Sequence, residues 1–289
     1  MKSLIFILLS LHLVAASYAQ DSRPKIGVVL SGGAARGFAH LGALQALEDN
    51  GIVPSYVAGA SMGAVIGSIY ANGMPPNSIY EFARKQKYRR LLNPSFASTG
   101  GLMKSTFIEK MLNMVIPHNS FDSLQKQFFV SVTNLDLARN EIMNSGNLKK
   151  VVCASASIPL IFEPTIIDGS TYVDGGLLNN LPVEPLLQIA DCQYIIGISV
   201  VATPDEPNKE WQGLQPAMRS FSIIIKNTEK ESRQKCHFFL EVEEVAMLRL
   251  ADFKRIDDFY DMGYRAMTEY INNTAELRSL GTPRNGLRK

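Results

Sequence analysis

The chain is poor in cysteine, histidine and tryptophan, with three, four and one of them in 289 residues. Three widely spaced cysteines do not form the disulfide framework of a small secreted scaffold, and no Cys/His spacing is typical of a zinc site. Cys153 and Cys192 lie in apolar sequence, which favours buried, unreactive thiols. One disulfide among Cys153, Cys192 and Cys236 stays open as an alternative.

The chain also lacks an excess of either charge, since it carries 29 basic and 27 acidic residues. Nucleic-acid-binding domains usually concentrate basic residues on one element, so we expect no nucleic-acid partner. After residue 19 no apolar run reaches the roughly 20 residues that span a bilayer. The length fits a single large domain.

Residues 1–19 have the features of a secretory signal peptide. Lys2 provides the positive start, residues 4–16 are mostly apolar, and Ser17 and Ala19 are small residues at the two positions that signal peptidase reads. We predict cleavage after Ala19 and export to a periplasm or the medium, with residues 20–289 as one domain. A membrane anchor is the alternative, but the apolar stretch is short for one.

Short aliphatic runs alternate with helical periodicity. Residues 25–30 and 53–58 are typical of buried strands, and apolar residues repeat at helical spacing over 38–47. This alternation predicts an α/β fold in which a mostly parallel sheet has helices on both faces. We expect a loosely ordered tail after residue 273. Further strands are predicted at 128–132, 171–173 and 194–200, and further helices at 147–155, 183–190 and 257–270.

The segment Gly59-Ala60-Ser61-Met62-Gly63 follows the second predicted strand directly. Gly59, Gly63 and the small Ala60 leave room for a sharp strand-to-helix turn that exposes the hydroxyl of Ser61. The N–H of Met62 would lie at a helix N-terminus, where the dipole favours negative charge. Ser61 is therefore a candidate nucleophile, although Gly-x-Ser-x-Gly also occurs by chance.

A second glycine turn, Ser31-Gly32-Gly33-Ala34-Ala35-Arg36-Gly37, follows the first predicted strand. Its N–H groups could stabilise an oxyanion. A dinucleotide-binding turn is the alternative, but Gly32 and Gly33 are adjacent rather than spaced as Gly-x-Gly-x-x-Gly. Glu48 and Asp49 also end a helix, whereas a ribose-binding carboxylate ends a strand.

A base for Ser61 is harder to find. His40 is expected to be a packed structural histidine, His118 to lie in a loop, and His237 to lack a loop signature although it follows the chain order of some triads. Asp174 follows a short predicted strand, and the turn Asp174-Gly175-Gly176 would present its carboxylate. A plain tight turn is the alternative for Asp-Gly-Gly.

Residues 80–120 mix helical periodicity with breakers and a cluster of cations. One interpretation is a solvated helix face, and the other is a mobile cap that meets an anionic membrane surface. The sequence leaves both open. The clustered cations are Arg84, Lys85, Lys87, Arg89 and Arg90.

The order of these motifs, a glycine turn with an arginine, then Gly-x-Ser-x-Gly, then Asp-Gly-Gly, resembles the patatin-like phospholipase family. The resemblance extends over about residues 25–267, and the segments 154–164, 175–182 and 252–264 are also similar to the family. It implies a three-layer patatin-like α/β fold. It also implies a serine acyl hydrolase that acts on phospholipids or related esters of lipid membranes, without a metal or cofactor.

The resemblance implies a catalytic dyad, in which Ser61 attacks the ester and Asp174 accepts its proton. Gly32, Gly33 and Ala34 would form the oxyanion loop, and Arg36 would hold that loop or add positive potential. The residues with implied roles are Ser61 and Asp174 for catalysis, Gly32, Gly33, Ala34, Arg36, Gly37 and Met62 for the oxyanion hole, and Gly59, Gly63, Gly175 and Gly176 for the two turns.

The proposed roles place a condition on Ala34 of the first turn and on the pKa of Asp174. Ala34 stands where the family often has glycine, and alanine is suited to the position if its φ is negative. An aspartate with a pKa near 4 is a weak base, so burial must raise the pKa of Asp174, and its carboxylate should lie roughly 2.6–3.2 Å from the Ser61 hydroxyl. A carboxylesterase for soluble esters and a non-catalytic lipid-binding protein are the alternative functions.

Overall fold

Within the described residues, strand β1 (Ile26–Leu30) lies inside an eight-stranded sheet, and all five of its residues are buried. The computed structural model describes residues 24–86, 105–201, 213, 215–249 and 252–281. In this part of the chain the sheet order is β5-β6-β3-β2-β1-β7-β8, with β4 paired to β3. The other strands are β2 (Tyr56–Gly59), β3 (Gln127–Asn134), β4 (Arg139–Met143), β5 (Thr165–Ile167), β6 (Ser170–Asp174), β7 (Tyr194–Ser199) and β8 (Phe238–Glu241).

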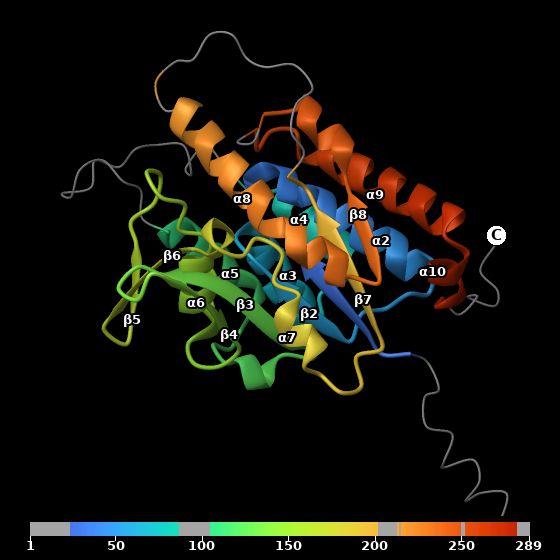
Figure 1. Cartoon of the computed structure of the whole chain (residues 1–289), viewed down its shortest axis with the longest axis horizontal. Helices are drawn as coiled ribbons and strands as arrows, with labels where there is room; N and C mark the ends of the chain where they lie inside the picture. The colour runs from blue at the N-terminus through green and yellow to red at the C-terminus, as the bar shows by residue number, and fades with distance from the viewer. Residues whose placement is uncertain (1–23, 87–104, 202–212, 214, 250–251, 282–289) are drawn as a thin grey trace, which may run out of the picture.

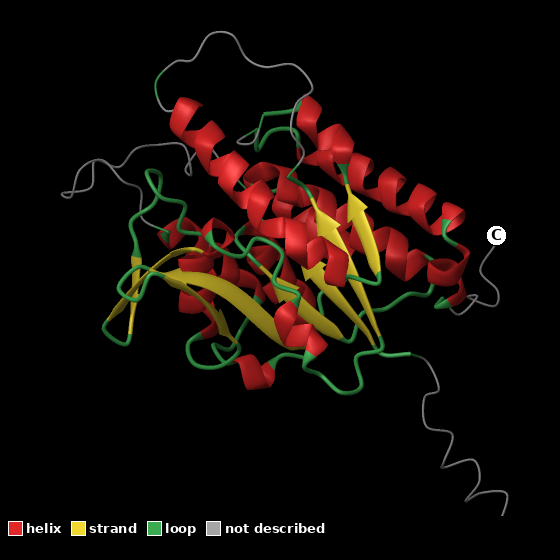
Figure 2. Cartoon of the chain, viewed as in Figure 1, coloured by secondary structure: helices red, strands yellow, loops and turns green. Residues whose placement is uncertain are grey.

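Helices cover both faces of this sheet, as Figures 1 and 2 show. Ile26, Val28 and Leu30 of β1 join the larger apolar core, whereas Val29 joins a second core on the opposite face. The helices are α2 (Ala39–Asp49), α3 (Met62–Ala71), α4 (Pro76–Arg84), α5 (Thr106–Val115), α6 (Leu148–Ser155), α7 (Glu184–Leu187), α8 (Gln215–Lys235), α9 (Ile256–Asn273) and α10 (Ala275–Ser279).

The two cores define three layers. Helices α2 and α3 contribute to the larger core, and α2 packs extensively against α9. Leu186 of α7 belongs to the second core, and a Cβ at Gly27 of β1 would lie 2.7 Å from its side chain. The α/β prediction is therefore confirmed.

The sheet is parallel from β3 through β2, β1 and β7 to β8, and antiparallel where β3 meets β4 and β6 and where β5 meets β6. The parallel strands β1 and β2 pair in register, Leu30 opposite Gly59, so the loops that follow them leave the same edge of the sheet. These loops contain the two glycine turns.

The same register brings a third segment to this edge. Gly59 of β2 lies opposite Val130 of β3, and Val132, two residues further along β3, lies opposite Asp174 of β6. Ser61, two residues beyond Gly59, therefore reaches the level of Asp174 although 113 residues separate the two.

The C-terminal tail and the basic segment differ from the sequence predictions or lie partly outside the described residues. The tail after Asn273 is not loosely ordered from its start, because α10 follows there and buries Leu277. The basic segment at 80–120 includes α4 and α5, but residues 87–104 lie outside the described residues, as do the signal-peptide residues 1–19. No helix within the described ranges is long and apolar enough to cross a membrane.

Candidate active site

Ser61 lies at the sharp turn between β2 and α3. Its φ of 51° and ψ of −123° are strained for a residue with a side chain. A Cβ at Gly63 would lie 2.2 Å from the carbonyl oxygen of Leu30, so only glycine allows α3 to begin this close to β1. A Cβ at Gly59 would likewise lie 2.6 Å from the Gly63 carbonyl oxygen. These contacts explain the sequence of the turn.

The hydroxyl of Ser61 donates a hydrogen bond to Oδ2 of Asp174 at 2.6 Å. The other carboxylate oxygen, Oδ1, accepts the N–H of Gly176 at 2.8 Å. Asp174 is 1% exposed, and this burial raises its pKa to about 7, against the opposing effect of the bonds from Ser61 and Gly176. A carboxylate with this pKa is a far stronger base than an exposed aspartate.

The turn after β1 lies beside Ser61, but its N–H groups differ in availability. Gly32 donates its N–H to Oδ1 of Asn180 at 3.1 Å, so Gly32 shapes the loop without offering that group. Within the described part of the chain, the N–H groups of Gly33, Ala34 and Met62 donate to no other residue. Ala34 has a φ of 47°, so the condition under which alanine suits this position is not met.

Arg36 and Gly37 support this turn. The buried guanidinium of Arg36 donates through Nε and Nη2 to the carbonyl oxygen of Leu248 at 3.2 and 2.8 Å. It thereby joins the turn to the segment before α9. A Cβ at Gly37 would lie 2.3 Å from Cγ of Met62, so this glycine lets the first turn pack on the second.

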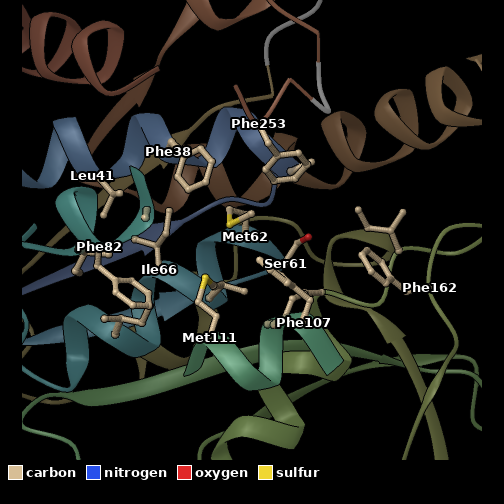
Figure 3. A pocket seen from close by; sticks show the side chains of 18 residues that line it. Phe38, Leu41, Ser61, Met62, Ile66, Phe82, Phe107, Met111, Phe162 and Phe253 are labelled. Carbon is tan, nitrogen blue, oxygen red and sulfur yellow. The ribbon is translucent and has the colours of Figure 1, made fainter. Parts of the chain in front are cut away.

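An apolar cavity opens beside Ser61 (Figure 3). It encloses about 700 Å³ of empty space, part of it open to solvent. Among the described residues, every one that lines it, other than Ser61, has an apolar side chain. In Figure 3, Phe162 and Phe253 lie near Ser61, and Leu41 and Phe82 lie at the far end. Part of the lining comes from α2, α3, α4 and α5, and the rest comes from the turn after β1, the loop after α6 and the turn at Phe253.

A family model described as patatin-like phospholipase matches residues 28–187, more than half of the chain. The chain belongs to the patatin-like phospholipase family. The match includes both glycine turns, Asp174 and the strands that place them, which confirms the resemblance noted in the sequence.

Relatives of this patatin-like chain are larger. An uncharacterized NTE family protein of Mycobacterium bovis is 31% identical over 216 residues, which cover 71% of this chain and 59% of that protein. Lysophospholipase NTE1 of Mycosarcoma maydis is 27% identical over 279 residues, covering 86% of this chain and 15% of that protein. The chain therefore spans less than two thirds of the length of either relative.

Among solved structures, VipD from Legionella pneumophila has a similar fold. The two superpose with a TM-score of 0.57 at 16% sequence identity, over 86% of this chain and 67% of that chain. At this identity the similarity concerns the fold alone.

The three histidines among the described residues of this patatin-like chain do not complete a triad with Ser61. The ring of His40 is buried and donates from Nε2 to the carbonyl oxygen of Ser31 at 2.8 Å, and burial lowers its pKa to about 4. His118 bonds to Asn72 at the far end of α3, and Nδ1 of His237 accepts the N–H of Ile195 near the start of β7. All three have structural contacts away from the Ser61 hydroxyl.

The cysteines are not paired with one another. Cys153, Cys192 and Cys236 all carry free thiols, and burial raises the pKa of Cys153 and of Cys236 to about 12. Across the described ranges, no three His, Cys, Asp or Glu side chains are grouped as a metal site. That the reaction needs no metal or cofactor stays a prediction.

Three polar residues contact the site in ways that the sequence does not predict. Ser155 of α6 accepts the N–H of Ser61, Asn180 accepts that of Gly32, and Glu229 of α8 accepts from Asn180. Ser155 and Asn180 lie in segments that resemble the family, but nothing in their spacing reveals the partner. Gly176 also packs on Asn180, since a Cβ there would lie 2.4 Å from Oδ1, and Gly175 packs on the Ser131 carbonyl.

Proposed function

We propose that the chain is an exported serine acyl hydrolase of phospholipase A or lysophospholipase type, which cleaves carboxylic ester bonds of phospholipids. The observation that carries the proposal is the 2.6 Å hydrogen bond between Ser61 Oγ and Asp174 Oδ2 at the wall of an apolar cavity. An activated hydroxyl there can attack the carbonyl carbon of an ester whose acyl chain occupies the cavity.

In this mechanism Asp174 accepts the Ser61 proton as the oxygen attacks. The N–H groups of Gly33 and Ala34, with that of Met62 at the N-terminus of α3, would stabilise the oxyanion. The tetrahedral intermediate expels the alcohol, which takes the proton from Asp174, and leaves an acyl group on Ser61. Water then attacks the acyl-enzyme and gives a proton to Asp174. The bond between the acyl group and Ser61 Oγ breaks, Oγ takes that proton back from Asp174, and the fatty acid leaves.

The dyad has a base of suitable strength. General-base catalysis is most efficient when the pKa of the base lies near the working pH. Burial raises the pKa of Asp174 to about 7. The carboxylate also needs no histidine to orient it, because Gly176 holds its second oxygen at 2.8 Å.

The substrate class follows from the cavity. The side chains of the described lining are apolar apart from Ser61 and offer no hydrogen bond to a polar acyl group, whereas a fatty-acyl chain gains roughly 0.8 kcal/mol for each CH₂ that leaves water. The name of the Mycosarcoma maydis relative, a lysophospholipase, is in keeping with this class.

Ester hydrolysis by the wild type, Ser61→Ala and Asp174→Asn tests the proposal, with a phospholipid offered in micelles and a short soluble ester offered as monomer. We expect activity only in the wild type, and a rise in rate above the critical micelle concentration. Higher activity on the soluble ester would favour a general carboxylesterase. Activity in Ser61→Ala would refute the dyad, and binding of lipid by an inactive wild type would favour a lipid-binding protein.

A fluorophosphonate probe gives an independent test, because it labels an activated serine covalently. Mass spectrometry of the labelled peptide should place the adduct on Ser61. Label on any other residue would overturn the assignment.

Export and membrane contact are separate parts of the proposal. N-terminal sequencing of protein recovered outside the cytoplasm should begin at Gln20, and a start at Met1 would refute cleavage.

Residues 80–120 are proposed to contact membranes peripherally. Replacement of Lys87, Arg89 and Arg90 with Gln should weaken co-sedimentation with anionic vesicles but not the hydrolysis of a soluble ester.

A further inference from the structure

A buried carboxylate on α8 is connected to the turn after β1 through one amide side chain. Glu229 and Asn180 are both fully buried. Asn180 Nδ2 donates to Oε1 of Glu229 at 2.7 Å, and Asn180 Oδ1 accepts the N–H of Gly32 at 3.1 Å. Ser199 donates to Oε2 of Glu229 at 2.8 Å. The carboxylate is thus joined to Gly32 by two successive hydrogen bonds.

Asn180 lies against the turn after β1, at Gly32, and against the turn after β6, at Gly176. A Cβ at Gly32 would lie 2.5 Å from Asn180 Oδ1, and one at Gly176 would lie 2.4 Å from the same oxygen. Gly176 follows Asp174 and donates to its carboxylate, and a Cβ at Gly32 would also lie 2.8 Å from Cβ of Ser61. A rotation of this one amide would therefore disturb the contacts of both turns.

The carboxylate determines which way the amide faces. An ionised carboxylate only accepts hydrogen bonds, so Oε1 of Glu229 selects Nδ2 of Asn180 and directs Oδ1 at Gly32. Without an acceptor on α8, Nδ2 of Asn180 would be buried with no partner, and the amide would gain by rotating toward another acceptor and away from the N–H of Gly32. Gly32 would then lose its bond, and the direction of the next N–H groups in the turn would no longer be fixed.

Burial of the Glu229 carboxylate costs free energy of desolvation. Burial raises the pKa of Glu229 to about 7, against the bonds from Ser199 and Asn180 and the positive Lys226, while the negative Glu241 adds to the rise. A leucine there would avoid the cost of desolvation. The hydrogen bond to Asn180 gives the carboxylate a geometric role that leucine could not fill.

We propose that Glu229 is a positioning residue of the hydrolase, which acts through Asn180 to fix the turn that presents the Gly33 and Ala34 N–H groups. This inference rests on the proposed function, since those groups matter only if an oxyanion forms. It predicts that α8, remote in sequence from all three motifs, controls the rate of the chemical step while leaving substrate binding unchanged.

The decisive comparison is Glu229→Leu with Glu229→Gln. Glutamine keeps an oxygen for Asn180 Nδ2 and offers its own NH₂ to Ser199 Oγ, whereas leucine offers neither. Misplaced oxyanion donors should lower kcat by about tenfold to a hundredfold in Glu229→Leu, with KM within about twofold of wild type. Glu229→Gln should restore most of the rate. Ser199→Ala, which leaves the Asn180 bond in place, should stay near wild type.

Hydrogen exchange of the Gly32 amide, followed by NMR in the full chain, supplies a readout that needs no turnover. Exchange should accelerate at least about tenfold in Glu229→Leu and in Asn180→Leu, but not in Glu229→Gln. Unchanged kcat in a folded Glu229→Leu protein, or unchanged Gly32 exchange, would overturn the inference. So would equal losses in the Leu and Gln variants, because they would indicate a generic structural role.

The same measurements separate this inference from the proposed function. A wild type that neither hydrolyses esters nor takes up a fluorophosphonate overturns the function. An active wild type whose Glu229→Leu variant is equally active overturns only the role of Glu229. If Glu229→Leu does not fold, Glu229→Ala, which also offers no acceptor to Asn180, takes its place in both measurements, and unchanged protection of Gly32 in a folded Glu229→Ala protein would be contrary evidence.

Discussion

The hydroxyl of Ser155 accepts the backbone N–H of Ser61 at 2.9 Å and donates to the carbonyl oxygen of Ser131 at 2.7 Å. It thereby ties the turn at Ser61 to α6 and β3. A residue at the φ and ψ of Ser61 carries strain of about 1–3 kcal/mol, which the surrounding contacts must offset. Ser155 supplies one of these contacts at the residue proposed as nucleophile.

Replacement of Ser155 with Ala should therefore affect both stability and rate. The buried N–H of Ser61 would lose its acceptor, at a cost of about 1–3 kcal/mol in the free energy of unfolding. The turn would be free to shift, and kcat should fall about tenfold or more. Urea unfolding and steady-state kinetics measure the two effects.

Ser157→Ala is the matched control, because Ser157 is also buried and donates to the carbonyl oxygen of Cys153 at 2.8 Å without contacting Ser61. It should lower stability by a similar amount and leave kcat nearly unchanged. Equal rates in the two variants would contradict the role assigned to Ser155.

The rate of ester hydrolysis should depend on pH through Asp174. The base must be ionised to accept the Ser61 proton, and burial raises its pKa to about 7. The value of kcat/KM should therefore rise from pH 5 to pH 8 and level off above an apparent pKa near 7. A profile that is already flat at pH 5 would mean that an aspartate of ordinary pKa is the base.

The contribution of Asp174 to the free energy of unfolding should fall with rising pH, whereas the rate rises. A carboxyl group of the unfolded chain ionises near pH 4, so the raised pKa of Asp174 favours the folded state below that pH. This contribution is lost as the pH rises through about 7. Asp174→Asn does not titrate and keeps the contacts to Ser61 and Gly176.

Asp174→Asn should consequently be inactive yet more stable than the wild type at pH 8, and the difference should shrink as the pH falls toward 4. Thermal unfolding at several pH values measures it. Glu229 titrates in both proteins, so its effect cancels in the comparison. A difference that does not change with pH would refute the buried, high-pKa state of Asp174.

The sequence predicted those parts of the site that local rules govern. The turn at Ser61 follows from two glycines between a strand and a helix, and the place of Asp174 follows from a short strand and a glycine turn. Asn180 and Glu229 could not be predicted, because they meet only when α8 packs against the segment after β6. The positive φ at Ala34 could not be predicted either, because it depends on how the whole turn packs and not on composition.

Ala34 offers a test of that turn. Its φ of 47° disfavours any residue with a Cβ, by roughly 1–2 kcal/mol. Glycine would relieve the strain but would add entropy to the unfolded chain, so Ala34→Gly should stabilise the protein by up to about 1 kcal/mol. Ala138, on an exposed turn with a φ of 49°, is the matched control, and Ala138→Gly should give a similar gain.

The two substitutions should differ in their effect on the rate. Ala34→Gly loosens the turn that presents the proposed oxyanion donors and should lower kcat severalfold, whereas Ala138→Gly should leave kcat unchanged. Urea unfolding and kinetics on both variants check this. Loss of stability in Ala34→Gly would show that the methyl group's packing in the cavity outweighs the backbone strain.

The length of the acyl chain should be set by the far end of the cavity, where Phe82 and Leu41 lie in Figure 3. Phe82→Ala would extend the space, and Ile66→Phe would shorten it between that end and Ser61. The preference for long over short acyl esters should rise in the first variant and fall in the second. Each CH₂ that gains or loses a place in the cavity should change the ratio of kcat/KM about fourfold, from roughly 0.8 kcal/mol per buried CH₂.

Hydrolysis of a series of esters with increasing chain length measures the ratio. Labelling by a small fluorophosphonate, which needs no space beyond Ser61, is the control and should be the same in both variants. A shift in the same direction for both would mean that the acyl chain lies elsewhere.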